Sequence, residues 1–228
     1  MSVRAKPLLI VLVIVVVAIG GVAVGKTWGQ HSTTTSTSTT TSTTVPVVPT
    51  NAVWPFVSSA SRFTDPVTAS FSFARDYLGF ATPTVSTVSG NVNSVASVRI
   101  RHASGGMVTI ISLERSTTDG TWWVVGAATA TIIVTTPVSG ASVTSPVVVS
   151  GRSTAYEGVV NVDVRQAGSI TSLARVNVLG GGMGTMGPFH ASIHFTTPSA
   201  SSGTVMFRER SAKDGSYVAA TVVPVRFS

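Results

Sequence analysis

Alternating apolar and polar residues predict three strands in the middle of the chain. Residues 94–101 place Ala, Val and Ile on one face and mainly Ser and Arg on the other, which is typical of a strand with one buried face. Residues 107–115 repeat the alternation after a Gly-Gly turn, and residues 122–127, WWVVGA, begin a third strand after a Thr-Asp-Gly turn. The two tryptophans point to opposite faces of that strand, so each either packs in a core or stacks a ring-shaped ligand.

An apolar period of three and four residues predicts a helix over residues 66–78. Asp65 is placed to cap its first turn, and Pro66 suits the first helical position. The expected apolar face consists of Val67, Phe71, Ala74 and Leu78, with Phe73 and Tyr77 beside it. Gly79 is placed to end the helix in a left-handed conformation. A helix followed by a meander predicts a small α+β domain at residues 51–130.

Seven short alternating segments follow, separated by turn residues. They are residues 131–135, 143–150, 158–166, 169–178, 189–196, 203–210 and 218–227. We expect an inward-facing core that contains Val160, Val162, Val164, Ile193, Phe195 and Val205. We expect an outward, solvated face that carries Asn161, Asp163, Arg165, His190 and His194. Seven such strands predict an antiparallel β-sandwich at residues 131–228.

One long apolar run, LLIVLVIVVVAIGGVAVG, lies near the start of the chain at residues 8–25. As a helix it would be about 27 Å long, close to the thickness of the hydrocarbon core of a bilayer. Arg4 and Lys6 precede the run and only Lys26 follows closely, which favours a cytoplasmic tail at residues 1–7. A cleaved signal peptide is the alternative, although the run exceeds the usual length of a signal-peptide core.

Residues 26–50 have the composition of a linker. Every residue from 32 to 44 is Ser or Thr, and a Val-Pro-Val-Val-Pro segment follows. The Ser/Thr tract has no apolar side chain to bury, and the prolines favour an extended chain. The linker suits either an O-glycosylated stalk or an unmodified spacer.

Composition and charge narrow the chemistry. The 228 residues include no cysteine, which excludes disulfides, thiolate metal sites, cysteine nucleophiles and a lipoprotein anchor. The net charge is +7, but the part after residue 26 carries 12 basic and 8 acidic residues, a net charge of only +4. This mild excess suits solubility or an anionic partner. The basic residues are scattered without interleaved aromatics, so we expect no nucleic-acid partner.

Short motifs after residue 130 follow the order of a known family. The blocks are IIVTTP at 132–137, SPVVVSG at 145–151, AYEG at 155–158, GPF at 187–189 and FRERSAKDGS at 207–216. In these blocks residues 131–228 resemble the immunoglobulin-like domain of bacterial spore germination proteins, the second domain associated with the GerMN module. Tyr156 stands where Phe is commoner. The resemblance implies an all-β immunoglobulin-like sandwich with an extracytoplasmic adhesive or assembly role. Residues 51–130 more loosely resemble a unit that precedes such a domain in exported bacterial proteins.

Candidate catalytic and metal-binding residues are few. His190 and His194 would lie about 13 Å apart on one strand, too far to share a metal ion. Glu157, Glu209 and Asp214 could include a glycan-hydrolysing pair. The alternative is that Glu157 and Glu209 pair with Arg152, Arg208 or Arg210 or bind turn amides, and that residues 214–216, Asp-Gly-Ser, form a turn. No nucleophile elbow or phosphate loop occurs in a suitable context. We therefore expect no catalytic, cofactor-binding or metal-binding residue.

Together these patterns predict a non-enzymatic protein of the bacterial cell envelope. We expect a single-pass anchor at residues 8–25, with the folded domains outside the cytoplasm and a protein or cell-wall partner. Contact is expected at two polar turns, through Tyr156, Glu157, Lys213 and Asp214. The alternatives are a cell-wall-directed hydrolase and a secreted glycan-binding protein.

Overall fold

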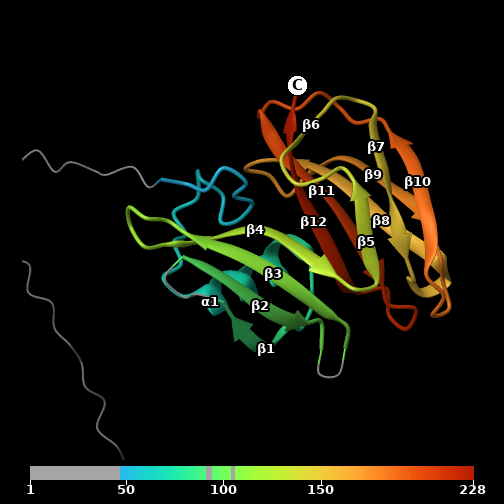
Figure 1. Ribbon diagram of the computed structural model, residues 1–228, viewed down its shortest axis with the longest axis horizontal. Coiled ribbons are helices and arrows are strands. Elements are labelled where there is room, and N and C mark those ends of the chain that lie inside the picture. The colour runs from blue at the N-terminus through green and yellow to red at the C-terminus, as the bar shows by residue number, and fades with distance from the viewer. Residues whose placement is uncertain (1–46, 91–93, 104–105) are drawn as a thin grey trace, which may run out of the picture. The chain divides into compact units, whose positions relative to one another are not determined.

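The described part of the chain is mostly β-sheet with one short helix (Figure 1). The computed structural model describes residues 47–90, 94–103 and 106–228. The predicted membrane segment at residues 8–25, the tail before it and most of the linker lie outside these ranges. Within them, no helix is long and apolar enough to cross a bilayer.

The helix begins and ends where the sequence predicts. Helix α1, Pro66–Ser72, continues without a break into a π-helical segment, η1, Phe73–Leu78. The Asp65 carboxylate accepts a hydrogen bond of 2.8 Å from the amide of Thr68. Gly79 ends the helix with a φ of 81°, a left-handed conformation that suits glycine.

The predicted apolar face of this helix is wrong in one respect. The buried residues are Ala69, Ser70, Phe73, Ala74, Tyr77 and Leu78. Phe71, expected on the apolar face, is 38% exposed. The buried residues recur every four positions, because the π-helical winding adds residues to each turn and keeps positions four apart on one side.

Four antiparallel strands follow the helix. Strand β1, Thr84–Ser89, was not predicted, because its TVSTVS sequence looks like a polar loop. The three predicted strands are confirmed as β2, Val95–Arg101, β3, Val108–Arg115, and β4, Trp122–Thr129. The helix packs against one face of this sheet, where Val98, Ile100 and Ile111 are fully buried. This is the first hydrophobic core.

The remaining strands form the predicted sandwich. They are β5 Ile132–Thr136, β6 Ala141–Val143, β7 Val147–Ser153, β8 Val159–Gln166, β9 Ser172–Leu179, β10 Gly187–Ile193, β11 Ser202–Arg210 and β12 Tyr217–Phe227. The single strand expected at residues 143–150 is divided into β6 and β7 around Pro146, which has no N–H to donate. Strands β5, β7 and β10 make one layer, and β12, β11, β8 and β9 make the other. The pairing within each layer is antiparallel, as predicted, but β6 pairs in parallel with the end of β12.

A second hydrophobic core lies between the two layers of the sandwich. It contains the valines predicted to face inward on β8, together with Ile193 and Val205. Phe195 is an exception, because β10 ends at Ile193 and leaves Phe195 just beyond it. Phe195 is half-buried and lies against Phe227, with ring centroids 5.5 Å apart.

Strands β11 and β12 belong to both cores. Their inner side chains, including Val205 and Phe207, enter the sandwich core, whereas Met206, Ala220 and Val222 enter the first core. Strand β12 also pairs with β4, so the sheet order runs β1-β2-β3-β4-β12-β11-β8-β9. The sheet built on the helix and the sheet of the sandwich are therefore continuous.

This arrangement overturns the predicted solvated face of β8. Asn161, Asp163 and Arg165 are only 6%, 0% and 4% exposed. The end of the helix and the neighbouring strands cover them, so β8 is buried on both faces. The polar residues on the outer face are paired with one another and with the helix.

Candidate functional site

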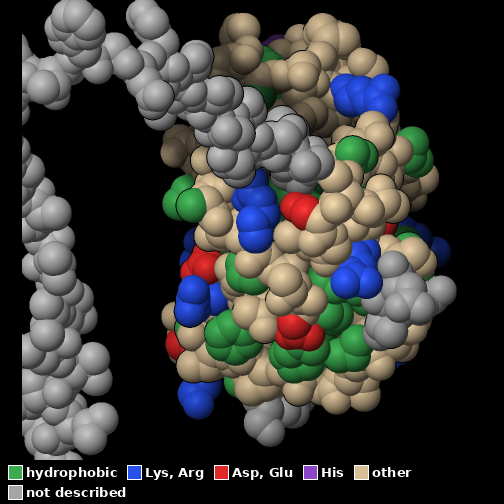
Figure 2. Space-filling view, turned by 90° about the vertical axis from the view of Figure 1, so that its left-hand side faces the viewer, with side chains coloured by type: hydrophobic (Ala, Val, Ile, Leu, Met, Phe, Trp, Pro, Cys, Tyr) green, Lys and Arg blue, Asp and Glu red, His purple; other side chains and the backbone are tan. Residues whose placement is uncertain are grey.

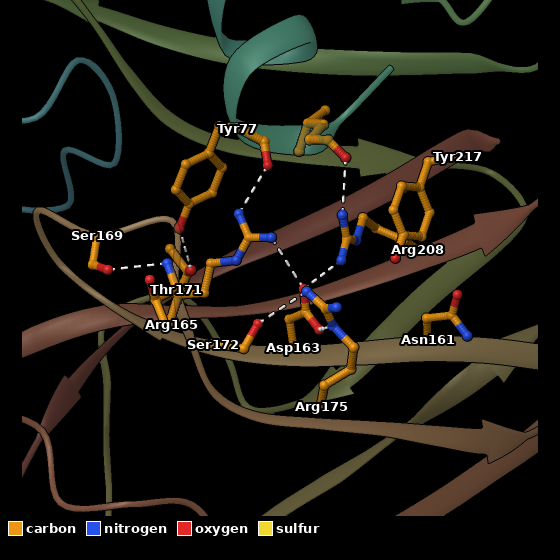
Figure 3. Close-up of polar contacts among 12 residues, drawn as sticks. Tyr77, Asn161, Asp163, Arg165, Ser169, Thr171, Ser172, Arg175, Arg208 and Tyr217 are labelled. Atoms are coloured by element: carbon orange, nitrogen blue, oxygen red, sulfur yellow. Dashed lines mark hydrogen bonds and ion pairs between the residues drawn. The ribbon is translucent and has the colours of Figure 1, made fainter. Parts of the chain in front are cut away.

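Three arginines converge on one buried carboxylate on the outer face of the sandwich (Figure 3). Asp163, on β8, accepts a hydrogen bond of 2.7 Å from Nε of Arg175 on β9 and one of 3.1 Å from Nη2 of Arg165. It also accepts a bond from Arg208 on β11. Arg165 and Arg208 are nearly inaccessible, whereas the side chain of Arg175 is 55% exposed. We call these four residues the Asp163 cluster.

The two buried arginines also bind the end of the helix. Arg165 donates to the carbonyl of Tyr77 at 2.9 Å, and Arg208 donates to the carbonyl of Leu78 at 3.0 Å. The last carbonyls of a helix have no partner within the helix and carry partial negative charge. The arginines satisfy these groups and hold the helix against the sandwich.

The Asp163 cluster has more positive than negative charge. Burial lowers the pKa of the Arg208 guanidinium to about 10, which still leaves it ionised at neutral pH. The hydrogen bond to Asp163 raises the pKa of Arg175 above its usual value. One carboxylate faces three guanidinium groups, so it cannot neutralise them all. The half-exposed Arg175 presents part of the remaining charge to solvent.

A second polar network lies next to the Asp163 cluster. Nδ2 of Asn161 donates to Oδ1 of Asn177 at 2.6 Å. Arg210, at the end of β11, donates to Oδ1 of Asn161, to the carbonyl of Gly215 and to the Tyr217 hydroxyl, each at 2.8 Å. These bonds fix Arg210 through neutral groups, so no carboxylate neutralises it there.

Arg175 of the Asp163 cluster and the residues Asn161, Asn177 and Arg210 of the second network line a hollow with a volume of about 410 Å³. Its lining consists of Tyr156, Glu157, Val159, Asn161, Arg175, Asn177, Arg210, Ser211 and Ala212. Its walls come from the short helical turn Tyr156–Gly158 and from the turn that follows β11. We call it the Tyr156 hollow.

The structure brings together the two turns where partner contact was predicted. Tyr156 is 47% exposed, and it lines the hollow together with the exposed Glu157. Lys213 and Asp214 are exposed and directly follow the lining residue Ala212. The expectation that these four residues contact a partner stays a prediction.

The backbone at both turns has left-handed conformations. Glu157 has a φ of 56°, which is uncommon for a residue with a Cβ and often accompanies function. Gly215 has a φ of 72° and closes the predicted Asp-Gly-Ser turn. There the Ser216 hydroxyl donates to Asp214 at 2.7 Å. This bond and that of the Ser216 amide lower the pKa of Asp214 to about 2.

The other candidate residues have structural roles or lie apart from the hollow. Glu209 is 1% exposed and accepts a hydrogen bond of 2.9 Å from the Tyr156 amide, as expected for an acid that binds a turn amide. Trp122 and Trp123 are 2% and 0% exposed, so both pack inside and neither can stack a ligand. His190 and His194 are exposed, as predicted. In the described ranges, no group of three or more His, Cys, Asp or Glu residues could hold a metal ion.

Sequence reasoning missed the polar lining of the hollow. Asn161 pairs with Asn177 across β8 and β9, and Asp163 pairs with Arg175. The sequence did carry a signal for this pairing. The polar residues of the two strands are complementary in type, an Asn opposite an Asn and an Asp opposite an Arg, and they alternate with apolar residues. The pattern was interpreted as an ordinary solvated face, because the helix that covers part of it is distant in sequence.

Charged side chains do not gather by sign on the face of the molecule shown in Figure 2. Lys and Arg side chains lie there among Asp and Glu side chains and uncharged surface. This distribution agrees with the scattered basic residues of the sequence.

Comparison with known proteins finds a family match for most of the sandwich. Residues 131–216 match the family model of the immunoglobulin-like domain of bacterial spore germination, Gmad2. This confirms the resemblance found in the sequence motifs. No curated protein and no solved structure matches the chain.

Proposed function

We propose, from the spore-germination immunoglobulin-like domain at residues 131–216, that the protein is a membrane-held envelope protein that works by contact. The Tyr156 hollow is its contact surface. The observation that carries this proposal is the meeting of two exposed turns, distant in sequence, around one charged hollow. Loops placed by a rigid sandwich are common sites of recognition.

The membrane part of the proposal rests on the N-terminal sequence. Residues 8–25 are long enough to span a bilayer, and the basic residues before them favour a cytoplasmic N-terminus. Residues 26–50 then act as a spacer, and the immunoglobulin-like domain lies outside the cytoplasm. The alternative is secretion after cleavage near Lys26.

We propose a non-catalytic role because Glu209, Asp214 and Asp163 already have other partners. Glu209 is buried on the Tyr156 amide, and Asp214 accepts the bonds of its own turn. Asp163 is surrounded by three arginines. A cell-wall-directed hydrolase remains the second candidate. It predicts cleavage of purified cell walls by the full-length chain, and loss of cleavage in Glu157→Gln.

Site-specific photocrosslinking in intact cells tests the contact surface. A photoreactive residue at Lys213, beside the hollow, is expected to crosslink an envelope component. The matched control is the same residue at His190, which is exposed on β10 in the other layer of the sandwich. Equal crosslinking from both positions, or none from Lys213, would contradict contact at the hollow.

Protease treatment of intact cells tests the topology. We expect added protease to remove the folded domains and to leave a short fragment in the membrane fraction. Mature protein in the medium that starts near Lys26 would support the secreted alternative. Protection of the folded domains in intact cells would contradict their export.

A further inference from the structure

We infer that the Tyr156 hollow binds a sugar that carries a carboxylate group. This inference rests on the proposed contact function and names the chemistry of the partner. It follows from three features of the hollow: cations that lack full neutralisation, an open aromatic ring, and neutral and acidic hydrogen-bonding groups.

The cations are Arg175 and Arg210. Arg175 uses Nε and Nη2 on Asp163 and Ser172, and no hydrogen bond of its Nη1 occurs within the described residues. Asp163 is also shared with the buried Arg165 and Arg208. The hydrogen bonds of Arg210 to the described residues all go to neutral oxygens. A carboxylate in the hollow would supply the missing negative charge and form charge-assisted hydrogen bonds.

The aromatic ring and the amide favour a sugar as the carrier of that carboxylate. Tyr156 is 47% exposed at the wall of the hollow and offers a flat apolar surface to a pyranose ring. Oδ1 of Asn177 already accepts from Asn161, which leaves the Asn177 amide N–H groups as donors for sugar oxygens. The volume of about 410 Å³ lies in the range of small-ligand sites.

Glu157 argues against a simple polyanion such as an acidic peptide. Its carboxylate lines the same hollow, and it forms no ion pair in the described part of the chain. A free carboxylate accepts hydrogen bonds from hydroxyl groups but repels a row of negative charges. A ligand with many hydroxyls and one acidic group satisfies both Glu157 and the arginines.

Calorimetric titration of the full-length chain tests the inference. The chain is kept in a detergent without a sugar headgroup, so that the detergent does not compete. The probes are a disaccharide that contains one uronic acid, its neutral hexose counterpart, a hexose phosphate and a short glutamate peptide. We expect the uronic acid disaccharide to bind at least about tenfold more tightly than the neutral one, and less tightly at high salt.

Variants assign the binding to the hollow. Arg175→Gln should weaken binding of the uronic acid disaccharide about tenfold, and Tyr156→Ala should weaken it for both disaccharides, because the ring contacts both. The matched control is Arg152→Gln, which removes an exposed arginine from β7 in the other layer. Thermal melting of each variant checks that the fold is kept.

The other outcomes separate this inference from the proposed function. Equal affinity for the two disaccharides, tighter binding of the phosphate or of the glutamate peptide, or an equal effect of Arg152→Gln would overturn the inference. If no sugar binds but Lys213 crosslinks to a protein, the inference of a sugar ligand is wrong and the proposed contact function is still supported. Absence of both binding and crosslinking would overturn both proposals.

Discussion

Strands β8, β11 and β12 are buried on both faces over most of their length, but around Asp163 the two faces are buried by opposite chemistry. On the inner face, Val162, Val164 and Phe207 are completely inaccessible and belong to the second hydrophobic core. On the outer face, Asp163 and Arg208 are 0% and 2% exposed and pair with each other. Burial of the inner face therefore depends on apolar contact, whereas burial of the Asp163 cluster on the outer face depends on hydrogen-bonding partners.

The two faces should also differ in how much stability is lost when a side chain is substituted. The inner face gains stability in proportion to the apolar area that it removes from water. The outer face gains little net energy from its ion pairs, because the charges lose their hydration on burial. Removal of one partner is nevertheless costly there, since the remaining charges stay buried without compensation.

The largest effect is expected from Asp163→Ala. This change leaves Arg165 and Arg208 buried without a carboxylate, and we expect it to lower the free energy of unfolding by about 3–5 kcal/mol. Chemical denaturation of the full-length chain, followed by tryptophan fluorescence, measures this loss. The control is Asp76→Ala, which removes an exposed carboxylate paired with exposed Arg75 and should cost less than about 1 kcal/mol. Equal losses would mean that the outer face does not depend on charge matching.

The inner face is tested by Val162→Ala. The change removes two carbons from a fully buried side chain, and we expect a loss of about 2 kcal/mol in the same measurement. Val148→Ala is the control, because Val148 is 45% exposed, and it should change stability by less than about 0.5 kcal/mol. A loss at Val162 as large as that at Asp163 would remove the distinction between the two faces.

Tyr77→Phe tests the contact between the helix and the outer face. The hydroxyl groups of Tyr77 and Thr204 form a buried hydrogen bond of 2.7 Å, and its loss should cost about 1 kcal/mol. Tyr156→Phe serves as the control, since the Tyr156 ring is open to solvent, and it should leave the free energy of unfolding unchanged. If neither variant is destabilised, the Tyr77 hydroxyl does not help to hold the helix in place.

The smallest effect concerns Asp214, an exposed carboxylate that contrasts with Asp163. Hydrogen bonds from Ser216 lower its pKa in the folded state to about 2, from an ordinary value of 3.8. The stabilisation from this turn is therefore present above pH 3.8 and is lost as the pH falls towards 2. NMR titration of the carboxyl carbon should show this low midpoint, and Ser216→Ala should raise it. An unchanged midpoint in Ser216→Ala would mean that Ser216 is not the cause.

The sequence predicted those elements whose hydrophobic pattern is local. The helix over residues 66–78 and strands β2, β3 and β4 carry their own periods and caps, and the structure confirms them. The inner valines of β8 were predicted for the same reason. The motif order of residues 131–216 predicted the immunoglobulin-like domain, which the family comparison confirms.

The parts that were missed depend on contacts between distant segments. Asp163 and Arg165 alternate with valines, and nothing local indicates that the carbonyls of Tyr77 and Leu78 will meet the arginines. Strand β1 was missed because Ser and Thr are as common in loops as at sheet edges. The two contact turns were predicted correctly as turns from their local sequence. The Tyr156 hollow between them could not be predicted, because it depends on the pairing of β8, β9 and β11.

Strands β11 and β12 contribute side chains to both hydrophobic cores, and this sharing should make unfolding cooperative. Separation of the helix and its sheet from the sandwich would expose Met206, Ala220 and Val222, which complete the first core. It would also break the bonds between the arginines and the end of the helix. Neither half can therefore open without loss to the other, so the two should melt in a single transition, and the amide hydrogens of β11 and β12 should exchange with solvent most slowly.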